Sequence, residues 1–395
     1  MIQEFEIWWL ISYPIVFALG WFAARIDLKQ LLSESRSVST SYFLGLKFLL
    51  SEQTDKAVET FHKIVRQEGE DNVELFFALA GLFRRRGEYE RAIRLHQDLI
   101  ERQDLSDNDR LNARFELAMD YYKAGMLDRA ETMFLDLMTT PKRQTASKIL
   151  LDIYQTEKSW QKAIEVSLTE TDESIDTQNV EVAHFYCELA QNALTHGKFV
   201  QAEAYANQAL GTNRHSVRAN LILGDIAVKE GNDLAAIDIY NRVELQNPDY
   251  LAMVAPKLID VYRRQDRLTE GYDLLYAYLT QYPSMDLLDI VFDLAKEIKG
   301  NDEAFEIVRD FFKKTPSLLG LDKFIEAELA REANHIRRSD LEAVKQLVYQ
   351  QSRGLAKYHC DNCGFLAKQF YWRCPGCGQW ETYSPKRTEE SAQAL

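Results

Sequence analysis

The first apolar pattern in the chain is an uninterrupted run near its start. Residues 7–24 (IWWLISYPIVFALGWFAA) carry no charged side chain. As a helix this run would be about 27 Å long, close to the roughly 30 Å hydrocarbon thickness of a bilayer. A cleaved signal peptide needs a basic leading segment, whereas Glu4 and Glu6 precede this run. A buried core helix is the other alternative. The pattern predicts a transmembrane anchor over residues 1–24.

Basic residues follow the apolar run directly, at Arg25, Lys29 and Arg36. Positive charge beside a membrane span marks its cytoplasmic side. The sequence therefore predicts a juxtamembrane linker over residues 25–40 and a cytoplasmic location for everything after it.

The second pattern is a long-range repeat. From residue 41 to about residue 336 the apolar positions follow helical periodicity, and strand signals are almost absent. A small residue recurs at gaps of 35, 38, 33, 39, 34, 35 and 33. These gaps cluster about the 34-residue period of tetratricopeptide repeats. The recurring residues are Ala57, Ala92, Ala130, Ala163, Ala202, Ala236, Gly271 and Ala304.

Other positions keep step with this repeat. Several units have glycine five residues before the small residue, at Gly87, Gly125, Gly197 and Gly231, and late units have proline twelve residues after it. Glycine makes a turn between two helices, proline stops the second helix, and the small residues let the helices approach. One helix pair cannot bury its apolar face, so neighbouring pairs stack into a superhelix. The sequence predicts an all-α tetratricopeptide-repeat solenoid of about eight repeats over residues 41–336.

A further helix is expected after the repeats. Ser339 precedes Asp340-Leu341-Glu342, which is typical of a capping box, and predicts a capping helix over residues 337–354. Only residues 355–359 separate it from the first of four clustered cysteines. So short a connection predicts that the following module is held against or near the end of the solenoid.

Four of the five cysteines form two C-x2-C pairs with ten residues between them. Two such turns complete a tetrahedral cage of four thiolates, which accepts iron or zinc. The pairs predict a small rubredoxin-like or zinc-ribbon metal module over residues 355–385, followed by a flexible tail over 386–395. The predicted ligands are Cys360, Cys363, Cys374 and Cys377.

So small a module needs additional support beyond its metal. Gly364 and Gly378 each follow a cysteine pair and suit tight turns. The sequence is also rich in aromatic residues here, and these are expected to form a small core of the module. They are Phe365, Phe370, Tyr371, Trp372 and Trp380.

Composition narrows the function classes. The chain has 395 residues, 46% of them hydrophobic, which excludes intrinsic disorder. Its net charge of −14 argues against a nucleic-acid partner, because phosphate contacts need a basic surface. Phosphate-binding glycine motifs are absent from the sequence, and a four-thiolate cage leaves no open position on a metal. These features favour a protein-binding array over an enzyme.

Candidate partner-binding residues lie in two basic clusters, Arg84-Arg85 and Arg263-Arg264. Both fall where first helices of a repeat are expected to end, so their side chains could face the groove. A solvated helix end is the alternative interpretation. The remaining cysteine, Cys187, is expected to be a packing residue, and His96 and His184 are expected to be packed or half-exposed rather than catalytic.

The assembled order resembles the lipopolysaccharide assembly protein B family of Gram-negative bacteria. The resemblance covers essentially the whole chain and departs from the family mainly in the longer, acidic leader. Its most telling stretches are FLLSEQTDKAVETF (48–61), LFRRRGEYERAIRLHQ (82–97), HFYCELA (184–190) and YWRCPGCGQW (371–380).

The resemblance implies a single-pass protein of the cell inner membrane, held in the bilayer by residues 7–24, with its bulk in the cytoplasm. It implies binding to the protease FtsH and promotion of its degradation of the deacetylase of the lipid A pathway. Other lipopolysaccharide-synthesis or transport proteins would be further partners. It also implies one iron ion held rubredoxin-style by the four clustered cysteines, with zinc as the alternative.

Two other functions stay open at this point. A rubredoxin-type electron carrier would cycle its iron between oxidation states and need a redox partner. A scaffold without a role in proteolysis would gather biosynthetic enzymes and leave the lifetime of the deacetylase unchanged.

Overall fold

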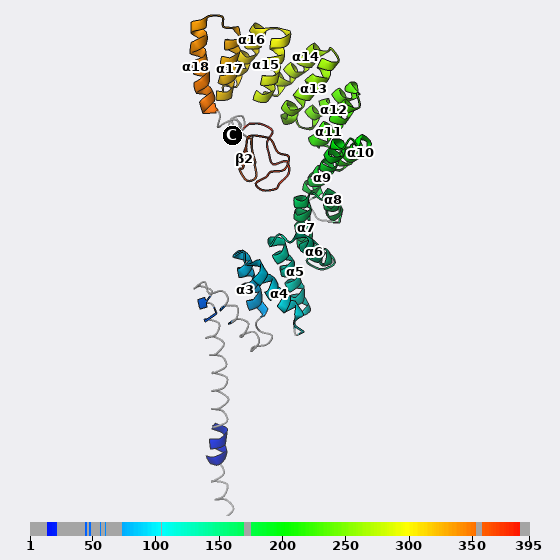
Figure 1. The fold of residues 1–395 in the computed structure, drawn as a ribbon, viewed down its shortest axis with the longest axis vertical. Helices are drawn as coiled ribbons and strands as arrows, with labels where there is room; N and C mark the ends of the chain where they lie inside the picture. The colour runs from blue at the N-terminus through cyan, green and yellow to red at the C-terminus, as the bar shows by residue number, and fades with distance from the viewer. Residues whose placement is uncertain are drawn as a thin grey trace, which may run out of the picture. The chain divides into compact units, whose positions relative to one another are not determined.

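The structure is a computed structural model of the whole chain (Figure 1). It describes residues 14–21, a few positions between 44 and 60, and residues 73–387 except 104, 170–174 and 353–357. The chain divides into two compact units, residues 1–146 and residues 147–395. The division falls inside one helix.

The described residues between 73 and 352 form helices that follow one another in antiparallel pairs, and a small module with two short strands follows. The helices are α3 (Val73–Arg85), α4 (Tyr89–Glu101), α5 (Asp107–Lys123), α6 (Leu127–Leu137), α7 (Arg143–Glu157), α8 (Trp160–Leu168), α9 (Ile175–Thr195), α10 (Phe199–Thr212), α11 (Val217–Lys229), α12 (Asp233–Gln246), the 3-10 turn η2 (Pro248–Tyr250), α13 (Leu251–Arg264), α14 (Leu268–Gln281), α15 (Met285–Ile298), α16 (Asn301–Lys314), α17 (Leu318–Arg331) and α18 (His335–Ser352). The strands are β1 (Tyr358–His359) and β2 (Leu366–Ala367), which pair antiparallel.

The predicted repeat corresponds to these helix pairs, and the tetratricopeptide fold is confirmed. The recurring alanines from residue 92 onward are buried where the two helices of a pair meet. The residue twelve positions before each recurring small residue lies on the first helix of the pair. At Gly224, for example, an added Cβ would lie 2.2 Å from the ring of Tyr240. In this pair the close approach of the two helices therefore requires a residue without a side chain at Gly224.

The turns within the pairs share one backbone feature. The residue five positions before the recurring small residue has a positive φ, between 54° and 80°, from the α3–α4 turn to the α13–α14 turn. Glycine adopts this conformation without steric cost, which explains the predicted glycine positions. Two turns place other residues there. The six residues are Gly87, Gly125, Lys158, Gly197, Gly231 and Asp266.

Proline ends the second helix in the later repeats, as predicted. Helices α12, α14 and α16 each end two residues before Pro248, Pro283 and Pro316. Proline cannot donate the backbone hydrogen bond that a longer helix would need.

The first unit has its own core. Aromatic and aliphatic residues of α3, including Phe76 and Phe83, pack against Ala92, Leu95 and Leu99 of α4. Helix α5 begins after Ser106, whose hydroxyl accepts a hydrogen bond from the backbone N–H of Asp109 at 3.1 Å. This is the usual way to satisfy a free donor at the start of a helix.

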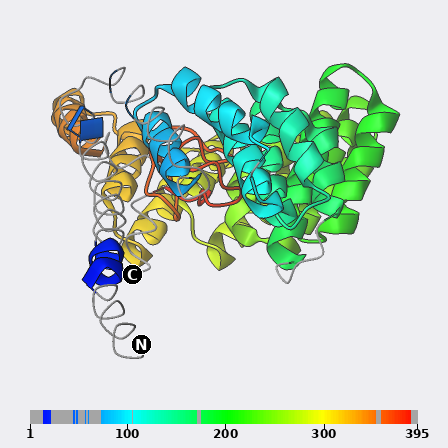
Figure 2. The same cartoon turned by 90° about the horizontal axis from the view of Figure 1, so that it is seen from below.

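In the second unit, helices α8 to α17 follow a curve, and the C-terminal module lies inside it (Figure 1). Figure 2 shows the green and yellow helices of this unit stacked side by side. Their buried faces form successive apolar clusters. One lies between α9, α10 and α11, the next between α11, α12 and α13, and a third spans α13 to α17.

The last helix begins earlier than predicted. Helix α18 starts at His335 rather than at residue 337, and it ends at Ser352. The reason is that the Asn334 side chain accepts the backbone N–H of Ile336 at 3.0 Å, so Asn334 caps the helix in place of Ser339.

The predicted anchor lies outside the described residues except for 14–21, which are helical. Within the part of the chain that the structure describes, none of the helices has both the length and the apolar character that a bilayer crossing requires.

Candidate metal centre

The C-terminal module is built on two turns of the same design. In the first turn, Gly364 N–H donates to the carbonyl of Cys360 at 2.8 Å, and Cys360 N–H donates to the carbonyl of Phe365 at 3.0 Å. The second turn repeats this geometry, with Gly378 N–H donating to the carbonyl of Cys374 at 2.8 Å. Both glycines have positive φ, 73° and 74°. The sequence C-x2-C-G therefore folds twice into the same knuckle.

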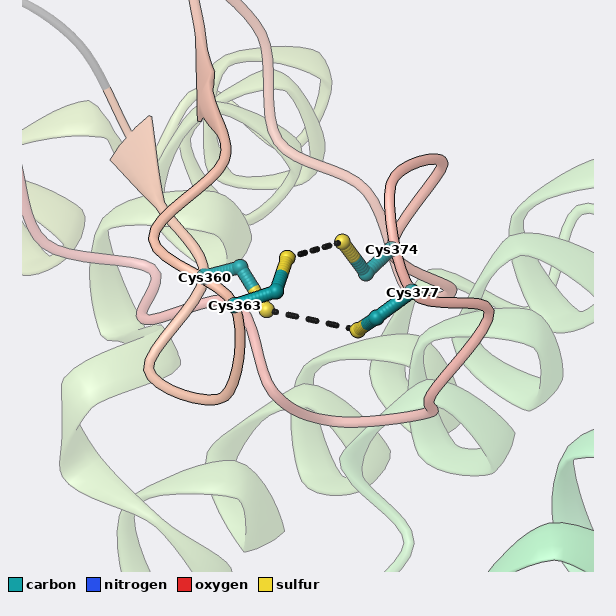
Figure 3. A group of neighbouring side chains, drawn as sticks. All are labelled: Cys360, Cys363, Cys374 and Cys377. Atoms are coloured by element: carbon teal, nitrogen blue, oxygen red, sulfur yellow. Dashed lines mark hydrogen bonds between the residues drawn. The ribbon is translucent and has the colours of Figure 1, made fainter.

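The two knuckles bring the four predicted ligands together (Figure 3). All four sulfur atoms lie within 4.8 Å of one another. The Sγ atoms of Cys360 and Cys377 are 3.8 Å apart, and those of Cys363 and Cys374 are 3.7 Å apart. Metal–sulfur bonds of about 2.3 Å in a tetrahedron give edges of about 3.8 Å. The donor set and its spacing therefore fit one tetrahedral metal ion with four thiolate ligands.

A metal requires the thiolate form of its ligands. The pKa of the Cys360 and Cys377 thiols is lowered, which favours that form, whereas the pKa of the Cys363 and Cys374 thiols is raised. The backbone N–H of Gly376 donates to Cys374 Sγ at 3.3 Å. A hydrogen bond from the Asn362 side chain, aided by a backbone N–H, lowers the pKa of the Cys377 thiol to about 6. Four thiolates bind either Fe or Zn(II), so the geometry identifies a metal site without selecting the metal.

The four ligands differ in their access to solvent. Cys360 and Cys374 are each 1% exposed, Cys377 is half-buried, and Cys363 is exposed. Phe365, which follows the first knuckle in the sequence, is 43% exposed.

The module is docked in the groove of the second unit through Trp380, which is 7% exposed. Its indole N–H donates to Gln155 Oε1 on α7 at 3.2 Å. Its ring stacks on His184 of α9, with centroids 4.7 Å apart and an interplanar angle of 13°. The rings of Trp160 and Phe185 make edge-to-face contacts with the indole, each with ring centroids 6.1 Å apart. Trp380 therefore contacts three successive helices of the array.

A second tryptophan of the module lies further along the groove. Trp372 stacks on Tyr250 of η2, with centroids 5.3 Å apart and an interplanar angle of 4°. The Arg218 guanidinium of α11 lies 5.8 Å from the Trp372 ring and 5.9 Å from the Trp380 ring. It also donates to Glu188 at 2.7 Å. A partly desolvated cation between two indoles adds attraction beyond burial of area.

A polar contact completes the docking. His184 Nε2 lies 2.9 Å from the carboxylate of Glu381, and because a carboxylate only accepts, His184 donates. Glu381 has a φ of 53°, a conformation that is rare for a residue with a side chain. Burial lowers the pKa of His184, and the bond to Glu381 opposes this effect.

Two basic residues hold the end of the module. Lys386 Nζ is 2.7 Å from an Asp249 carboxylate oxygen, and Arg387 pairs with Asp286 of α15. The tail was expected to be flexible from residue 386 onward, and these first two residues are instead held by ion pairs.

These contacts correct two expectations. The module lies across the groove from α7 to α15, rather than at the end of the solenoid. The aromatic core was predicted only in part: Phe370 and Tyr371 pack against the module's own cluster. Trp372 and Trp380 instead pack on the repeats, and Phe365 is 43% exposed. The short linker led to the first error, because α18 itself carries the chain back toward the inside of the curve of helices, where the module lies (Figure 1).

The first basic cluster lies at the end of α3 in the first unit. Arg84 donates to Asp120 Oδ1 at 3.0 Å and to Glu116 Oε2 at 2.6 Å, both on α5. Asp120 is fully buried and also contacts His96 Nδ1 at 2.5 Å. Arg85 is exposed. Arg84 therefore joins two neighbouring repeats.

The second basic cluster lies at the end of α13 in the second unit. Arg263 donates to Glu297 at 2.6 Å and Arg264 donates to Asp233 at 2.8 Å. Each pair again links adjacent repeats. Whether these arginines or those of the first cluster bind a partner stays a prediction.

Cys187 is completely buried in the α9–α11 cluster, and burial raises the pKa of its thiol to about 12. His96 and His184 are each 1% exposed. All three are packing residues, as expected. What the sequence reasoning missed is that His184 and Phe185, both in the HFYCELA stretch, contact Trp380.

Comparison with known proteins agrees with this architecture. Residues 358–385 match the rubredoxin metal binding domain, and residues 44–107 and 187–250 match the tetratricopeptide repeat. A tetratricopeptide repeat protein from Parabacteroides merdae is similar to 71% of the chain and 99% of its own length, at 15% identity and a TM-score of 0.30. The identity and the TM-score of this match are too low to bear on function.

Full-length relatives are more informative. Lipopolysaccharide assembly protein B of Escherichia coli strain K12 is 31% identical over 376 residues, covering 95% of this chain and 96% of its own. The protein of the same name from Haemophilus influenzae is 31% identical over 391 residues, covering 95% and 97%.

Fold and site together define a tetratricopeptide-repeat protein with a rubredoxin-type metal knuckle docked in its groove. The extent of the two full-length likenesses identifies its family. The chain belongs to the lipopolysaccharide assembly protein B family.

Proposed function

We propose that this protein is a membrane-anchored adaptor that limits lipopolysaccharide synthesis. In this proposal it has no catalytic activity of its own. It binds the deacetylase of the lipid A pathway and presents it to the protease FtsH at the cytoplasmic face of the inner membrane. Residues 7–24 form the anchor, and an iron ion occupies the four-cysteine site.

The observation that carries the proposal is the likeness to the two relatives, which extends over 95% of the chain and includes both the repeats and the knuckle. Both relatives are named for lipopolysaccharide assembly. Tetratricopeptide arrays present extended surfaces to other proteins, which suits an adaptor. An anchor would confine adaptor and protease to one membrane and raise their effective concentration.

The docked knuckle supports a rigid adaptor rather than a mobile carrier domain. Trp380, Trp372 and Arg387 hold it at three separate places along the groove. In our proposal the metal therefore maintains the shape of the binding surface.

A pulse-chase of the deacetylase, with and without this protein, tests the proposal. The deacetylase is expected to persist longer when the protein is depleted, and the effect is expected to disappear when FtsH is also inactive. An unchanged half-life on depletion would contradict the proposal, and dispersal of the biosynthetic enzymes in the same cells would then favour the scaffold.

A matched pair of variants makes the test specific. Trp380→Ala removes the central docking contact, whereas Phe365→Ala removes an exposed ring of the same module. We expect the deacetylase to be stabilised by the first variant and little changed by the second. Both variants must be present at wild-type abundance for the comparison.

A further inference from the structure

The metal centre has one ligand that solvent reaches freely. Cys363 is exposed, while Cys360 and Cys374 are each 1% exposed. The fifth cysteine, Cys187, is also completely buried, in the repeats. Thiol reagents dissolved in water therefore meet Cys363 before the other cysteines.

The exposed ligand also has a partner at reacting distance. Cys363 Sγ lies 3.7 Å from Cys374 Sγ, across the gap between the two knuckles (Figure 3). A disulfide between them would join the two turns and remove two of the four metal ligands at once. The other close sulfur pair, Cys360 and Cys377, would be left with two thiolates, too few to hold the ion.

We propose that Cys363 is an oxidation site and Cys374 its resolving cysteine, so that a peroxide converts the metal centre into a Cys363–Cys374 disulfide and releases the knuckle from the groove. The proposal concerns a chemical modification of this chain, and it stands independently of the function proposed above.

The chemistry balances with hydrogen peroxide as the oxidant. The Cys363 thiolate attacks one peroxide oxygen, an S–O bond forms, the O–O bond breaks and hydroxide leaves, which gives a sulfenic acid. The Cys374 thiolate then attacks the Cys363 sulfur, an S–S bond forms, the S–O bond breaks and a second hydroxide leaves. The two thiolates together lose two electrons, and one peroxide is reduced to two hydroxides.

Release of the knuckle follows from its size. A segment as short as residues 358–387 depends on its metal for a stable fold. Loss of that fold withdraws Trp380 from His184 and Trp372 from Tyr250, and Arg218 loses both indoles. Oxidation at one exposed sulfur would therefore uncover the groove from α7 to η2.

The test treats the metal-loaded full-length protein with hydrogen peroxide and follows three readouts. Released metal is measured with a colorimetric chelator, the cross-link by peptide mass spectrometry under non-reducing conditions, and undocking by tryptophan fluorescence. We expect about one ion released and about two thiols lost per chain, together with a Cys363–Cys374 cross-linked peptide. Reductant and metal added together should reverse all three.

The order of reaction distinguishes this proposal from general damage. Dimedone, which traps sulfenic acids, should label Cys363 first. A Cys187→Ser variant should release metal at the wild-type rate, since Cys187 is buried in the α9–α11 cluster and is not one of the four clustered cysteines. First labelling at Cys377 or Cys360, a first cross-link that omits Cys363, or metal retained after thiol loss would each overturn the proposal.

Discussion

One backbone conformation recurs in the turns of the array whatever side chain is placed there. Four of the six turn residues with positive φ are glycine, and the other two, Lys158 and Asp266, have φ values of 58° and 54°. Side chains with a Cβ pay a steric cost in this region, of roughly 1–2 kcal/mol. These two residues therefore adopt the turn because the packed helices on either side impose it.

Replacing either residue by glycine is expected to stabilise the protein. Glycine removes the steric cost of the positive φ, but it is also more flexible in the unfolded chain, which offsets part of that benefit. We therefore expect the free energy of unfolding to rise by about 0.5–1 kcal/mol. Lys158→Gly should gain more than Asp266→Gly, because aspartate tolerates this conformation better than lysine does. Thermal unfolding followed by circular dichroism measures both.

Lys148→Gly is a suitable control for this prediction. Lys148 is an exposed residue within α7, where glycine costs about 1 kcal/mol of stability. A higher melting temperature for the control, or a lower one for Lys158→Gly, would contradict the interpretation of strain in the turn.

Among the elements, the docked knuckle has a contact that responds to pH. The pKa of buried His184 is lowered from its ordinary value of 6.5, chiefly by burial. Glu381 and Glu188 favour its charged form, and Arg218 opposes it. Because the undocked state binds a proton more readily than the docked state, the stability of docking is complete above pH 6.5 and decreases as the pH falls below it.

We therefore expect the knuckle of the wild-type protein to undock at lower urea concentration at about pH 6 than at about pH 7.5. Tryptophan fluorescence during the titration reports the change. His184→Gln should dock less firmly at both values and show a smaller difference between them. If the urea concentration of undocking changed with pH as much in that variant as in the wild type, the pH dependence would belong to groups other than His184.

The helices and the knuckle could be predicted from the sequence because each depends on residues close together in the chain. A turn needs one residue with a positive φ, which is usually glycine. The metal cage needs four cysteines within eighteen positions, Cys360 to Cys377. The docking could not be predicted this way. It depends on which of many buried aromatic residues line a groove, and Gln155 and Trp380 are 225 positions apart. His184 and Phe185 look like ordinary core residues in the sequence.

At the scale of the whole molecule, we expect the metal to support the knuckle but not the repeats. We expect a Cys360→Ser/Cys374→Ser variant to lose the metal and the docked module while the array stays helical. The reason is that the α9–α11 and α13–α17 clusters contain no residue of the module. Far-UV circular dichroism should remain close to the wild type. Protease cleavage within residues 358–387 should become at least about tenfold faster.

Cys187→Ala provides the matched control, since it removes a thiol from the repeats and leaves the metal ligands intact. It should retain the metal and a protected knuckle. Loss of helical structure in the double variant would show that the repeats also depend on the metal. An undisturbed knuckle without metal would show that docking alone maintains its fold.

The 225 residues between Gln155 and Trp380 also set a delay during synthesis. At about 5–20 residues per second, a ribosome needs roughly 10–45 s to deliver Trp380 after Gln155 has emerged. Throughout that interval the rings of Trp160 and Phe185 stack on each other but lack their contact with Trp380. Incompletely covered apolar surface is prone to aggregation, so the newly made array is expected to need chaperone protection until Trp380 has been synthesised.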